Sequence, residues 1–334
     1  MATIYEVSKA AGVSLATVSR VMNGNVRVSE RTRDKVLKAM TELGYKPNAI
    51  AQSLASNCSN SVGLLVSALH GSFFGDMMST VENVLRKAGK HVVITAGHSD
   101  EEKEKQAIEF LLDRRCDALI LHAEAVSDEY LLELAKGDAQ IILINRKIDA
   151  ISERCFYTDN ELGGYLATKA ALDAGHKDIA YISGPLFKGD AKERLAGHQR
   201  ALAEANIAFN DALLVEGGYH EAEGAQGLEQ LYRAKHKFSA LICANDEMAS
   251  GAMTAARELG IAIPEQLSII GFDNVLFARY LYPKLTTIDN PIRLMGEAAA
   301  HWVLAHVYQQ RGVAEPRNLF APSLVARDSL VSAP

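Results

Sequence analysis

Eight short apolar runs between residues 62 and 270 constrain the fold of this chain more than any other feature. Each run is apolar at consecutive positions, and stretches with helical patterning separate the runs. Continuous hydrophobic strands separated by helices are typical of parallel sheets that helices cover on both faces. The runs are Val62–Val66, His91–Ile94, Ala118–Leu121, Ile141–Ile144, Ile179–Ile182, Leu213–Val215, Ala240–Cys243 and Leu267–Ile270.

The number of runs predicts two sheets, because eight strands are many for one open sheet. The pattern breaks between Asp149 and Cys155, which suggests where the first sheet ends. We therefore predict two similar α/β subdomains of parallel strands. Loops at the carboxyl ends of such strands form ligand sites, so a cleft between the subdomains would hold a small molecule.

The first 45 residues have a different pattern, that of three short helices. Thr3–Glu6 forms a capping box that predicts a helix from about residue 4, and Gly12 can end that helix. Ser14 caps a second helix, and a third spans Thr32–Leu43 and stops at Gly44. This pattern predicts an all-α helix-turn-helix head, whose second helix could enter a DNA major groove. A small three-helix bundle with a structural or protein-binding role is the alternative.

The caps and core of the third helix can also be assigned from the pattern. Ser29 looks like its N-cap. We expect an apolar stripe to close the core of the head, at Val36, Leu37, Met40 and Leu43.

Charge separates the head from the rest of the chain. Residues 1–60 hold eight lysines and arginines against four acids, which gives +4, whereas the whole chain is −6. The remainder is therefore −10. A basic head on an acidic body favours nucleic-acid binding by the head.

A short segment joins the two parts. Ala49–Ser56 has good helix formers but is too short to be stable alone, because helix nucleation is costly. We expect it to fold only against a partner copy or DNA. The polar residues 57–61 follow as a linker.

Composition bounds the remaining possibilities. A chain of 334 residues with 23% charged and 48% hydrophobic residues is typical of a globular protein with two or three domains. It shows no signal-peptide core and no membrane-span run, so we expect a cytoplasmic protein with no membrane partner. Its four cysteines, at positions 58, 116, 155 and 243, lack zinc spacing and predict reduced structural thiols. Nothing in the sequence predicts a metal or cofactor.

Several predicted strand ends carry polar or aromatic side chains. Carboxylates and amides exchange hydrogen bonds with hydroxyl groups, a guanidinium bridges two oxygens, and an aromatic ring covers the apolar face of a sugar. The set therefore suits a polyhydroxylated ligand. For each member a helix cap or local ion pair is the alternative, above all for Asp246, which opens a helix. The strand-end residues are His70, Phe73, Phe74, Asn145, Arg146, Asp159, Asn160, Asp190, Arg194, Tyr219, Asn245, Asp246, Asp273 and Asn274.

No catalytic motif accompanies these residues. The sequence contains no G-x-S-x-G elbow, phosphate-binding loop, dinucleotide fingerprint or H-E-x-x-H helix. Its ten histidines are scattered, and His70, His98 and His122 lie near strand ends only as individuals. A binding role is favoured over an enzyme.

Five spaced motifs run across the whole chain. They are Thr3-Ile4-x-x-Val7, Ala11–Ser14, Thr17–Val21, Gly44-Tyr45-x-Pro47-Asn48-x-x-Ala51-x-x-Leu54 and Gly271-Phe272-Asp273. Together they resemble the motifs of the LacI/GalR family of bacterial transcription regulators, in particular its branch of galactose and β-glucoside repressors. The resemblance implies a head at 1–46, a hinge helix and linker at 47–60, and an effector-binding and dimerisation body at 61–334. That body would be similar to periplasmic binding proteins, with an N-subdomain at about 61–159 and 290–318 and a C-subdomain at about 160–289 and 319–334.

For the head, the resemblance places Leu15 and Ala16 at base-reading positions. Both lack donors and could read bases only through apolar contacts. Leu54 would be a hinge leucine that wedges into a minor-groove step. The candidate DNA-binding residues are Thr3, Ser14, Leu15, Ala16, Thr17, Ser19, Arg20, Asn23, Ser29, Leu54 and Ala55.

For the body, the resemblance implies an effector sugar held between the subdomains. Ser8 and Asn274 depart from the family pattern. Ser8 replaces a small alanine and is tolerable if its hydroxyl bonds to a carbonyl. The candidate effector residues are Phe73, Phe74, Asn145, Arg146, Asp159, Asp190, Arg194, Tyr219, Asn245, Asp273 and Asn290.

The implied function is a repressor of a sugar-utilisation operon that galactose or a related galactoside or glucoside releases from its operator. The expected partners are palindromic operator DNA, a small sugar effector and a second copy of the chain. No leucine heptads of a tetramer follow Arg327, which favours a homodimer. A ligand acting as co-repressor and a transport-type sugar-binding protein are the alternatives.

Overall fold

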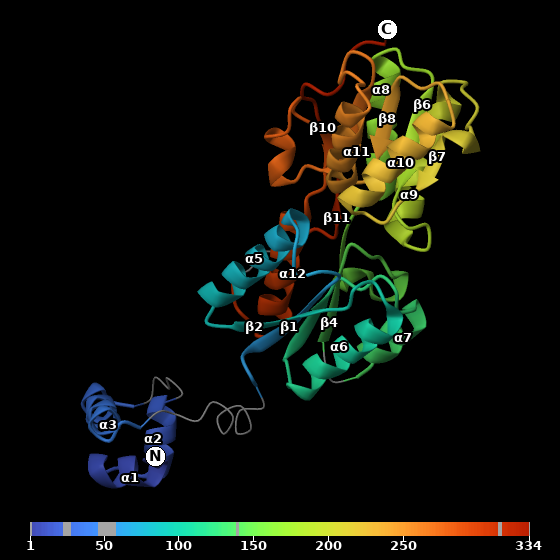
Figure 1. The fold of residues 1–334 in the computed structure, drawn as a ribbon. Coiled ribbons are helices and arrows are strands. Elements are labelled where there is room, and N and C mark those ends of the chain that lie inside the picture. Colours follow the sequence, from blue (N-terminus) through green and yellow to red (C-terminus); the bar gives the residue numbers. More distant parts are fainter. Residues whose placement is uncertain (1, 23–27, 46–57, 138–139, 313–315, 334) are drawn as a thin grey trace. The chain divides into compact units, whose positions relative to one another are not determined.

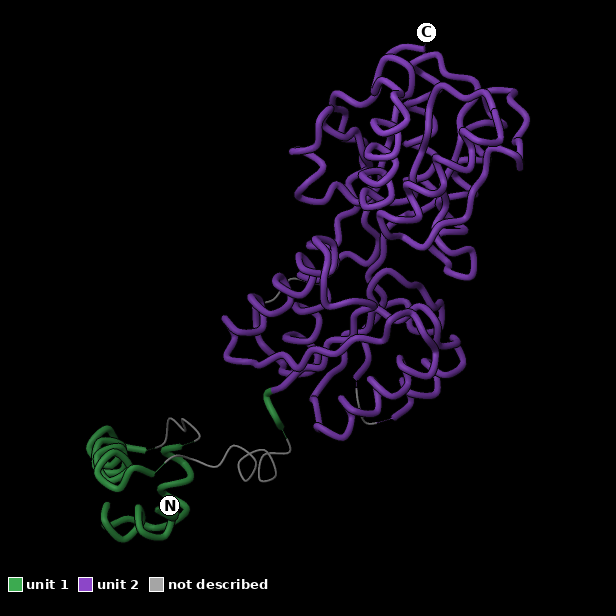
Figure 2. Tube along the Cα trace, in the orientation of Figure 1, with its two compact units in different colours: residues 1–60 green, residues 61–334 purple. Residues whose placement is uncertain are grey.

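The computed structural model describes residues 2–22, 28–45, 58–137, 140–312 and 316–333. The chain divides into two compact units, residues 1–60 and 61–334 (Figure 2). We call them the head and the body.

The described residues of the head form three helices, α1 (Ile4–Ala11), α2 (Leu15–Met22) and α3 (Glu30–Glu42). The capping box of α1 is confirmed, since the Thr3 hydroxyl accepts from the backbone N–H of Glu6 and the Glu6 carboxylate accepts from that of Thr3. Gly12 ends α1 in the left-handed conformation. Ser14 caps α2 by accepting from the backbone N–H of Thr17 at 3.2 Å. The predicted helix-turn-helix arrangement is therefore present.

Details of the head differ from the prediction. Ser29 occupies the N-cap of α3, but its hydroxyl bonds to that of Thr32 instead of a backbone N–H. Leu37 and Leu43 were predicted in the core and are 48% and 39% exposed, because the core of the head centres on Val36 and Ala39 of α3. The helix α3 begins two residues before the predicted start at Thr32 and ends one residue before the predicted end at Leu43.

Ser8 has the compensating bond that its position requires. Its hydroxyl donates to the carbonyl oxygen of Val13 at 2.6 Å, across the turn between α1 and α2. The hydroxyl therefore stabilises the turn.

The body contains two six-stranded sheets. The first has the order β11-β5-β4-β3-β1-β2, and the second has the order β12-β10-β9-β8-β6-β7. All pairings are parallel except that of β10 with β12. The strands of the first sheet are β1 (Ser61–Val66), β2 (His91–Ala96), β3 (Ala118–Leu121), β4 (Gln140–Ile144), β5 (Cys155–Thr158) and β11 (Leu319–Phe320); those of the second are β6 (Ile179–Ser183), β7 (Leu214–Glu216), β8 (Ala240–Cys243), β9 (Ser268–Asp273), β10 (Thr286–Asp289) and β12 (Ser323–Val325).

Helices cover both faces of the first sheet (Figure 1). On one face, Leu64 of β1 packs with Met77 of α5 and Trp302 of α12. On the other, Leu65 packs with Ile108 of α6. The alternation explains why β1 is apolar throughout. The helices of the body are α5 (Ser72–Lys87), α6 (Glu101–Asp113), α7 (Asp128–Ala135), α8 (Asn160–Asp173), α9 (Gly189–Glu204), α10 (Glu221–Arg233), α11 (Asp246–Glu258) and α12 (Ile292–His306), with short 3₁₀ helices η1 (Asp149–Arg154), η2 (Asp211–Leu213) and η3 (Leu276–Arg279).

The chain crosses between the two halves of the body three times. We call the half with the first sheet the N-half and the half with the second the C-half. The break that suggested the end of the first sheet is the 3₁₀ helix η1, after which β5 returns to that sheet. The crossings follow Thr158, Asp289 and Phe320. The last lies two residues beyond the expected position, because β11 pairs with β5.

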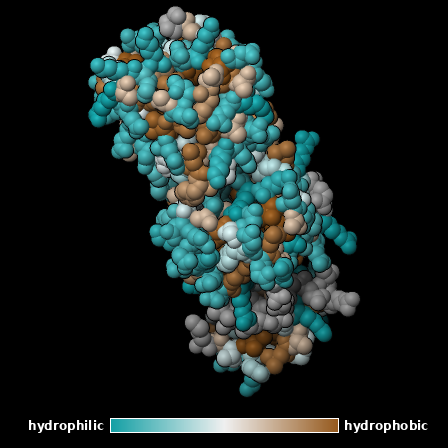
Figure 3. All heavy atoms as spheres, turned by 90° about the vertical axis from the view of Figure 1, so that its right-hand side faces the viewer, coloured by the Kyte–Doolittle hydropathy of each residue, from teal (hydrophilic) through white to brown (hydrophobic). Residues whose placement is uncertain are grey.

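Surface properties agree with a globular chain. The face in Figure 3 is mostly hydrophilic, with hydrophobic residues in scattered groups. Within the described residues, no helix is both long and apolar enough to cross a membrane. All four cysteines are thiols, and three of them are buried, which confirms the predicted reduced thiols.

Candidate functional site

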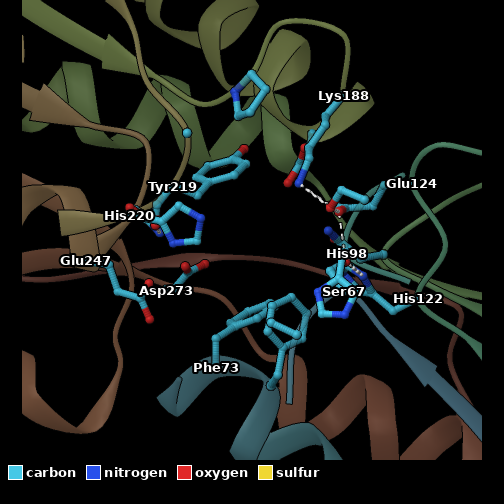
Figure 4. Close-up of a pocket in the computed structure, with 18 of the residues that line it drawn as sticks. Ser67, Phe73, His98, His122, Glu124, Lys188, Tyr219, His220, Glu247 and Asp273 are labelled. Atoms are coloured by element: carbon cyan, nitrogen blue, oxygen red, sulfur yellow. Dashed lines mark hydrogen bonds and ion pairs between the residues drawn. The ribbon is translucent and has the colours of Figure 1, made fainter. Parts of the chain in front are cut away.

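A cavity of about 550 Å³ is lined by residues of both halves of the body. Figure 4 shows Ser67, His98, His122 and Glu124 of the N-half on one side, and Tyr219, His220, Glu247 and Asp273 of the C-half on the other. The other lining residues are Ala68, His70, Phe73, Phe74, Ser99, Asn145, Pro185, Phe187, Lys188, Asp190, Arg194, Gly218, Asn245 and Val275.

Arg194 of α9 is the central cation of the C-half wall. It is 2% exposed, and its guanidinium donates to the Ala244 carbonyl at 2.6 Å and to the Asn160 side chain at 2.9 Å. The guanidinium carbon of Arg194 lies over the Phe272 ring, 3.7 Å from its centroid. Close packing of α8 on α9 positions it, because a Cβ at Gly164 would overlap the Arg194 carbonyl oxygen. The guanidinium is therefore fixed before any ligand binds.

Two carboxylates flank Arg194, that of Asp190 at 3.7 Å and that of Asp273 at 3.8 Å. These separations are longer than direct hydrogen bonds, so both carboxylates keep oxygens for another donor. The Asn290 amide donates to Asp273 at 3.0 Å. Burial raises the pKa of the Asp273 carboxyl to about 7, although Arg194 and Asn290 oppose the rise.

Aromatic rings form the apolar walls. Phe73 and Phe74, at the start of α5, meet edge to face with their centroids 5.3 Å apart. Tyr219 follows β7 in the left-handed conformation, with φ of 73°. Burial raises the pKa of its phenol well above the ordinary value, and no described side chain or backbone group pairs with its hydroxyl. A ligand between these rings would bury apolar carbons and meet one unsatisfied hydroxyl.

An ion pair joins the two halves beside the cavity. The ammonium of Lys188, at the N-terminus of α9, lies 2.8 Å from the Glu124 carboxylate that follows β3. Hydroxyls of Ser67 and Ser99 donate to the same carboxylate at 2.8 and 2.6 Å. Burial alone would raise the pKa of Glu124, but His122, Lys188 and Ser99 lower it to about 2. Glu124 is therefore ionised.

Eight of the eleven predicted effector residues line this cavity. They are Phe73, Phe74, Asn145, Asp190, Arg194, Tyr219, Asn245 and Asp273. Arg146, Asp159 and Asn290 lie outside it because each has another structural task. Arg146 pairs with Asp128 at 2.6 Å, Asp159 caps α8 by accepting from the Leu162 N–H, and Asn290 supports Asp273. Arg146 and Asp159 line a second cavity instead.

The sequence left open whether Asp246 contacts a ligand or has a structural role. In the structure its role is structural. It is fully buried and accepts from the Val275 backbone at 2.9 Å and from the Thr287 hydroxyl at 2.5 Å. It does not line the cavity. It fixes the loop after β9, and through that loop the position of Val275 in the cavity wall.

About half of the polar lining was not predicted from the sequence. The unpredicted residues are Ser67, Ser99, Glu124, Lys188, His220 and Glu247, and His98 and His122 were interpreted as isolated residues. The available signal was position, since Ser67, His98 and Glu124 each follow a strand of the first sheet. Lys188 carries no such signal.

The candidate DNA surface of the head lies on α2 and the turn before it. Ala16 and Arg20 are exposed, and Leu15 and Thr17 are half-buried, whereas Val18 faces the core. Ser19 is half-buried, and Thr3, Ser14 and Ser29 are exposed at helix N-termini. Asn23, Leu54, Ala55 and the predicted helix Ala49–Ser56 lie outside the described residues.

The raised pKa of Asp273 predicts how its removal changes stability with pH. From about pH 4 to pH 7 the unfolded chain loses this proton while the folded chain keeps it, so this carboxyl lowers stability as pH rises and adds nothing further above 7. We expect Asp273→Asn to gain stability relative to wild type over that interval. Urea unfolding of both proteins at several pH values measures the difference, in which all unchanged groups cancel. If the difference in unfolding free energy between the two proteins did not change with pH, that result would contradict the raised pKa of Asp273.

A helix-turn-helix head together with a two-sheet body around a ligand-sized cavity defines the class of one-chain DNA-binding regulators with an effector domain. Family models for the bacterial regulatory proteins of the lacI family and for a periplasmic binding protein-like domain match residues 3–48 and 168–330. The chain belongs to the LacI family and is a DNA-binding transcriptional repressor, not an enzyme.

Individual relatives agree. The chain is 42% identical to the transcriptional regulator GalR of Escherichia coli over 99% of this chain and 96% of the relative. It is 36% identical to the regulator AscG of the same organism, over 99% of each. Its structure is similar to that of the lac repressor dimer bound to operator and the anti-inducer ONPF, with a TM-score of 0.86, 29% identity and 99% of both chains covered. The resemblance to the GalR branch is confirmed.

Proposed function

We propose that this chain represses a sugar-utilisation operon as a homodimer, and that galactose or a related galactoside or glucoside in the cavity weakens operator binding. The observation that carries the proposal is the wall around Arg194. There, buried carboxylates with free acceptor capacity lie beside aromatic rings. A sugar needs both features, because it presents hydroxyls at its edges and C–H groups on its faces.

The cavity also suggests how a ligand acts on DNA. Both halves line it, so a bound sugar would favour one relative orientation of the halves. The N-half begins directly after the hinge and linker at 47–60, through which a change of orientation would reach the two heads. By linkage, operator DNA must weaken sugar binding by the same factor.

On DNA, two copies of α2 would read the two halves of a palindromic operator in the cytoplasm. Leu15 and Ala16 would meet apolar base edges, and Arg20 would supply a phosphate contact. Specificity is therefore shared with the hinge.

The direct test is an operator titration, using a site selected from random DNA, with and without D-galactose, D-glucose and methyl β-D-glucoside. We expect at least one of them to weaken binding. Tighter binding would identify the ligand as a co-repressor, the second candidate, and no change with any sugar would reject this effector class. A thermal-shift screen with the same sugars reports binding independently of DNA.

The hinge gives a separate prediction. Leu54→Ala should weaken binding to the selected operator by roughly tenfold or more, because an apolar wedge stabilises a kinked step only in the specific complex. Binding to random DNA depends on phosphate contacts and should change little. Fluorescence anisotropy with both DNAs measures the ratio. Equal losses on both would show that Leu54 is no wedge.

A further inference from the structure

The hydrogen-bond network of the N-half determines where the protons lie, once its donors are counted. The Glu124 carboxylate can only accept, so the single hydroxyl proton of Ser67 is donated to it, at 2.8 Å. The same Ser67 oxygen lies 3.2 Å from Nδ1 of His122. With its proton already used, Ser67 can only accept from His122. In the neutral ring, Nδ1 therefore carries the hydrogen.

This assignment leaves Nε2 of His122 as a bare acceptor. His122 is 3% exposed and lines the cavity. No described group forms a hydrogen bond with Nε2. Its ring meets the rings of Phe74 and Phe73 edge to face, with centroids 5.2 and 6.5 Å away, and both are apolar. A buried acceptor without a donor is costly, and a bound ligand that donates there would remove the cost.

We propose that Ser67 and Glu124 are positioning residues that make His122 a reader of one ligand hydroxyl. The site would accept a hydroxyl that donates to Nε2. It would reject a ligand with only an acceptor at that position, such as a fluorine, an ether oxygen or a phosphate oxygen. This inference deepens the proposed function and rests on it for the identity of the ligand as a polyhydroxylated molecule.

Lys188 of the C-half also belongs to this hydrogen-bond network. Lys188 donates to the Glu124 carboxylate at 2.8 Å and to the Ser99 hydroxyl at 2.9 Å. Ser99 therefore accepts from Lys188 and donates its own proton to Glu124, and it does not touch His122. The Lys188 ammonium adds to the positive charge that keeps Glu124 ionised, so the contact between the halves supports the orientation of the Ser67 hydroxyl.

Nuclear magnetic resonance tests the proton position without any ligand. In protein with ¹⁵N-labelled histidine at about pH 8, where an ordinary imidazole is neutral, His122 Nε2 should resonate as an unprotonated nitrogen. His122→Asn assigns the signal by its loss. In Ser67→Ala the signal should shift toward a mixture of tautomers, because Nδ1 loses its acceptor, and Glu124→Ala should act in the same direction. Ser152→Ala, at an exposed serine of η1 outside the cavity, is the control and should leave the signal unchanged.

Isothermal titration calorimetry tests whether the site selects a ligand with a donating hydroxyl at this position. Of D-galactose, D-glucose and methyl β-D-glucoside, the tightest binder is compared with its singly deoxyfluorinated derivatives. Fluorine replaces the hydroxyl in size but cannot donate. At one position the replacement should weaken binding to wild type and to the control Ser152→Ala by roughly tenfold, as expected when a buried acceptor loses its donor. In Ser67→Ala the same replacement should weaken ligand binding by less than about threefold.

Two results would overturn the inference. One is a protonated Nε2 in wild type, or a His122 spectrum that neither Ser67→Ala nor Glu124→Ala changes. The other is a fluorine penalty that remains equal in Ser67→Ala at every ring position. If none of the three sugars binds, the proposed sugar effector fails, whereas the resonance experiment still decides the tautomer.

Discussion

Asp273→Ala should abolish the response to sugar while operator binding stays within about twofold of wild type. The Asp273 carboxylate lies in the cavity wall and holds an oxygen for a ligand hydroxyl between Arg194 and Asn290. Removing the carboxylate takes away that acceptor. It also leaves Asp190 as the remaining carboxylate of the two that flank the buried Arg194 guanidinium. Losing a charged hydrogen-bond partner from a buried site costs roughly 100-fold in affinity. The operator titration with and without D-galactose, D-glucose and methyl β-D-glucoside measures both properties.

Two further variants keep this prediction sharp. Asp273→Asn preserves shape and tolerates the positive φ of 104° at this position, so it separates lost charge from disturbed backbone. Asp211→Asn changes an exposed carboxylate of η2 outside the cavity and should respond like wild type. If both Asp273 variants fail to bind operator as well, the residue maintains the fold. If both respond normally to sugar, it is not part of the ligand site.

The architecture was largely predictable because buried parallel strands are apolar at consecutive positions. All eight predicted runs are strands. The missed strands have weaker patterns. β10 begins with Thr286 and Thr287, whose hydroxyls bond to neighbouring groups, and β5 follows directly on the 3₁₀ helix η1. β11 and β12 have two and three residues, too few for a periodic pattern.

The lining of the cavity was predicted more completely in the C-half than in the N-half, where Phe73, Phe74 and Asn145 were predicted but the ionised residues were not. In the C-half, polar residues at the ends of β8 and β9 stand out against apolar strands, which singled out Asn245 and Asp273. Glu124 of the N-half pairs with Lys188 of the C-half, which is 64 positions away in the sequence and meets it only through the fold. A lysine before a helix ordinarily indicates a solvated side chain, so no local pattern identifies it. The same limit applies to Leu37, which is exposed because α3 turns Val36 and Ala39 toward the core of the head.

Asp246 and Asp273 show why residue type alone did not decide which residue stabilises the fold and which lines the cavity. Both are aspartates at ends of neighbouring strands, and burial raises the pKa of both. Their partners differ. Asp246 accepts from Val275 and Thr287, so its acceptor capacity is used by the framework. Gly271 of β9 permits this contact, because a Cβ there would overlap the Asp246 carboxylate.

Asp246→Ala should therefore destabilise the body, by about 3 kcal/mol, since it leaves a buried backbone N–H and a buried hydroxyl without their acceptor. Asp246→Asn should lose less, because its carbonyl oxygen can accept from the Val275 N–H while its amide donates to the Thr287 hydroxyl oxygen. Urea unfolding at 25 °C measures the loss, and calorimetry should show a melting temperature lower by several degrees. Sugar affinity at low temperature, where the variant stays folded, should fall far less than in Asp273→Ala. Unchanged stability together with lost sugar binding would instead make Asp246 a ligand contact, and would move the ligand site toward the strand β10.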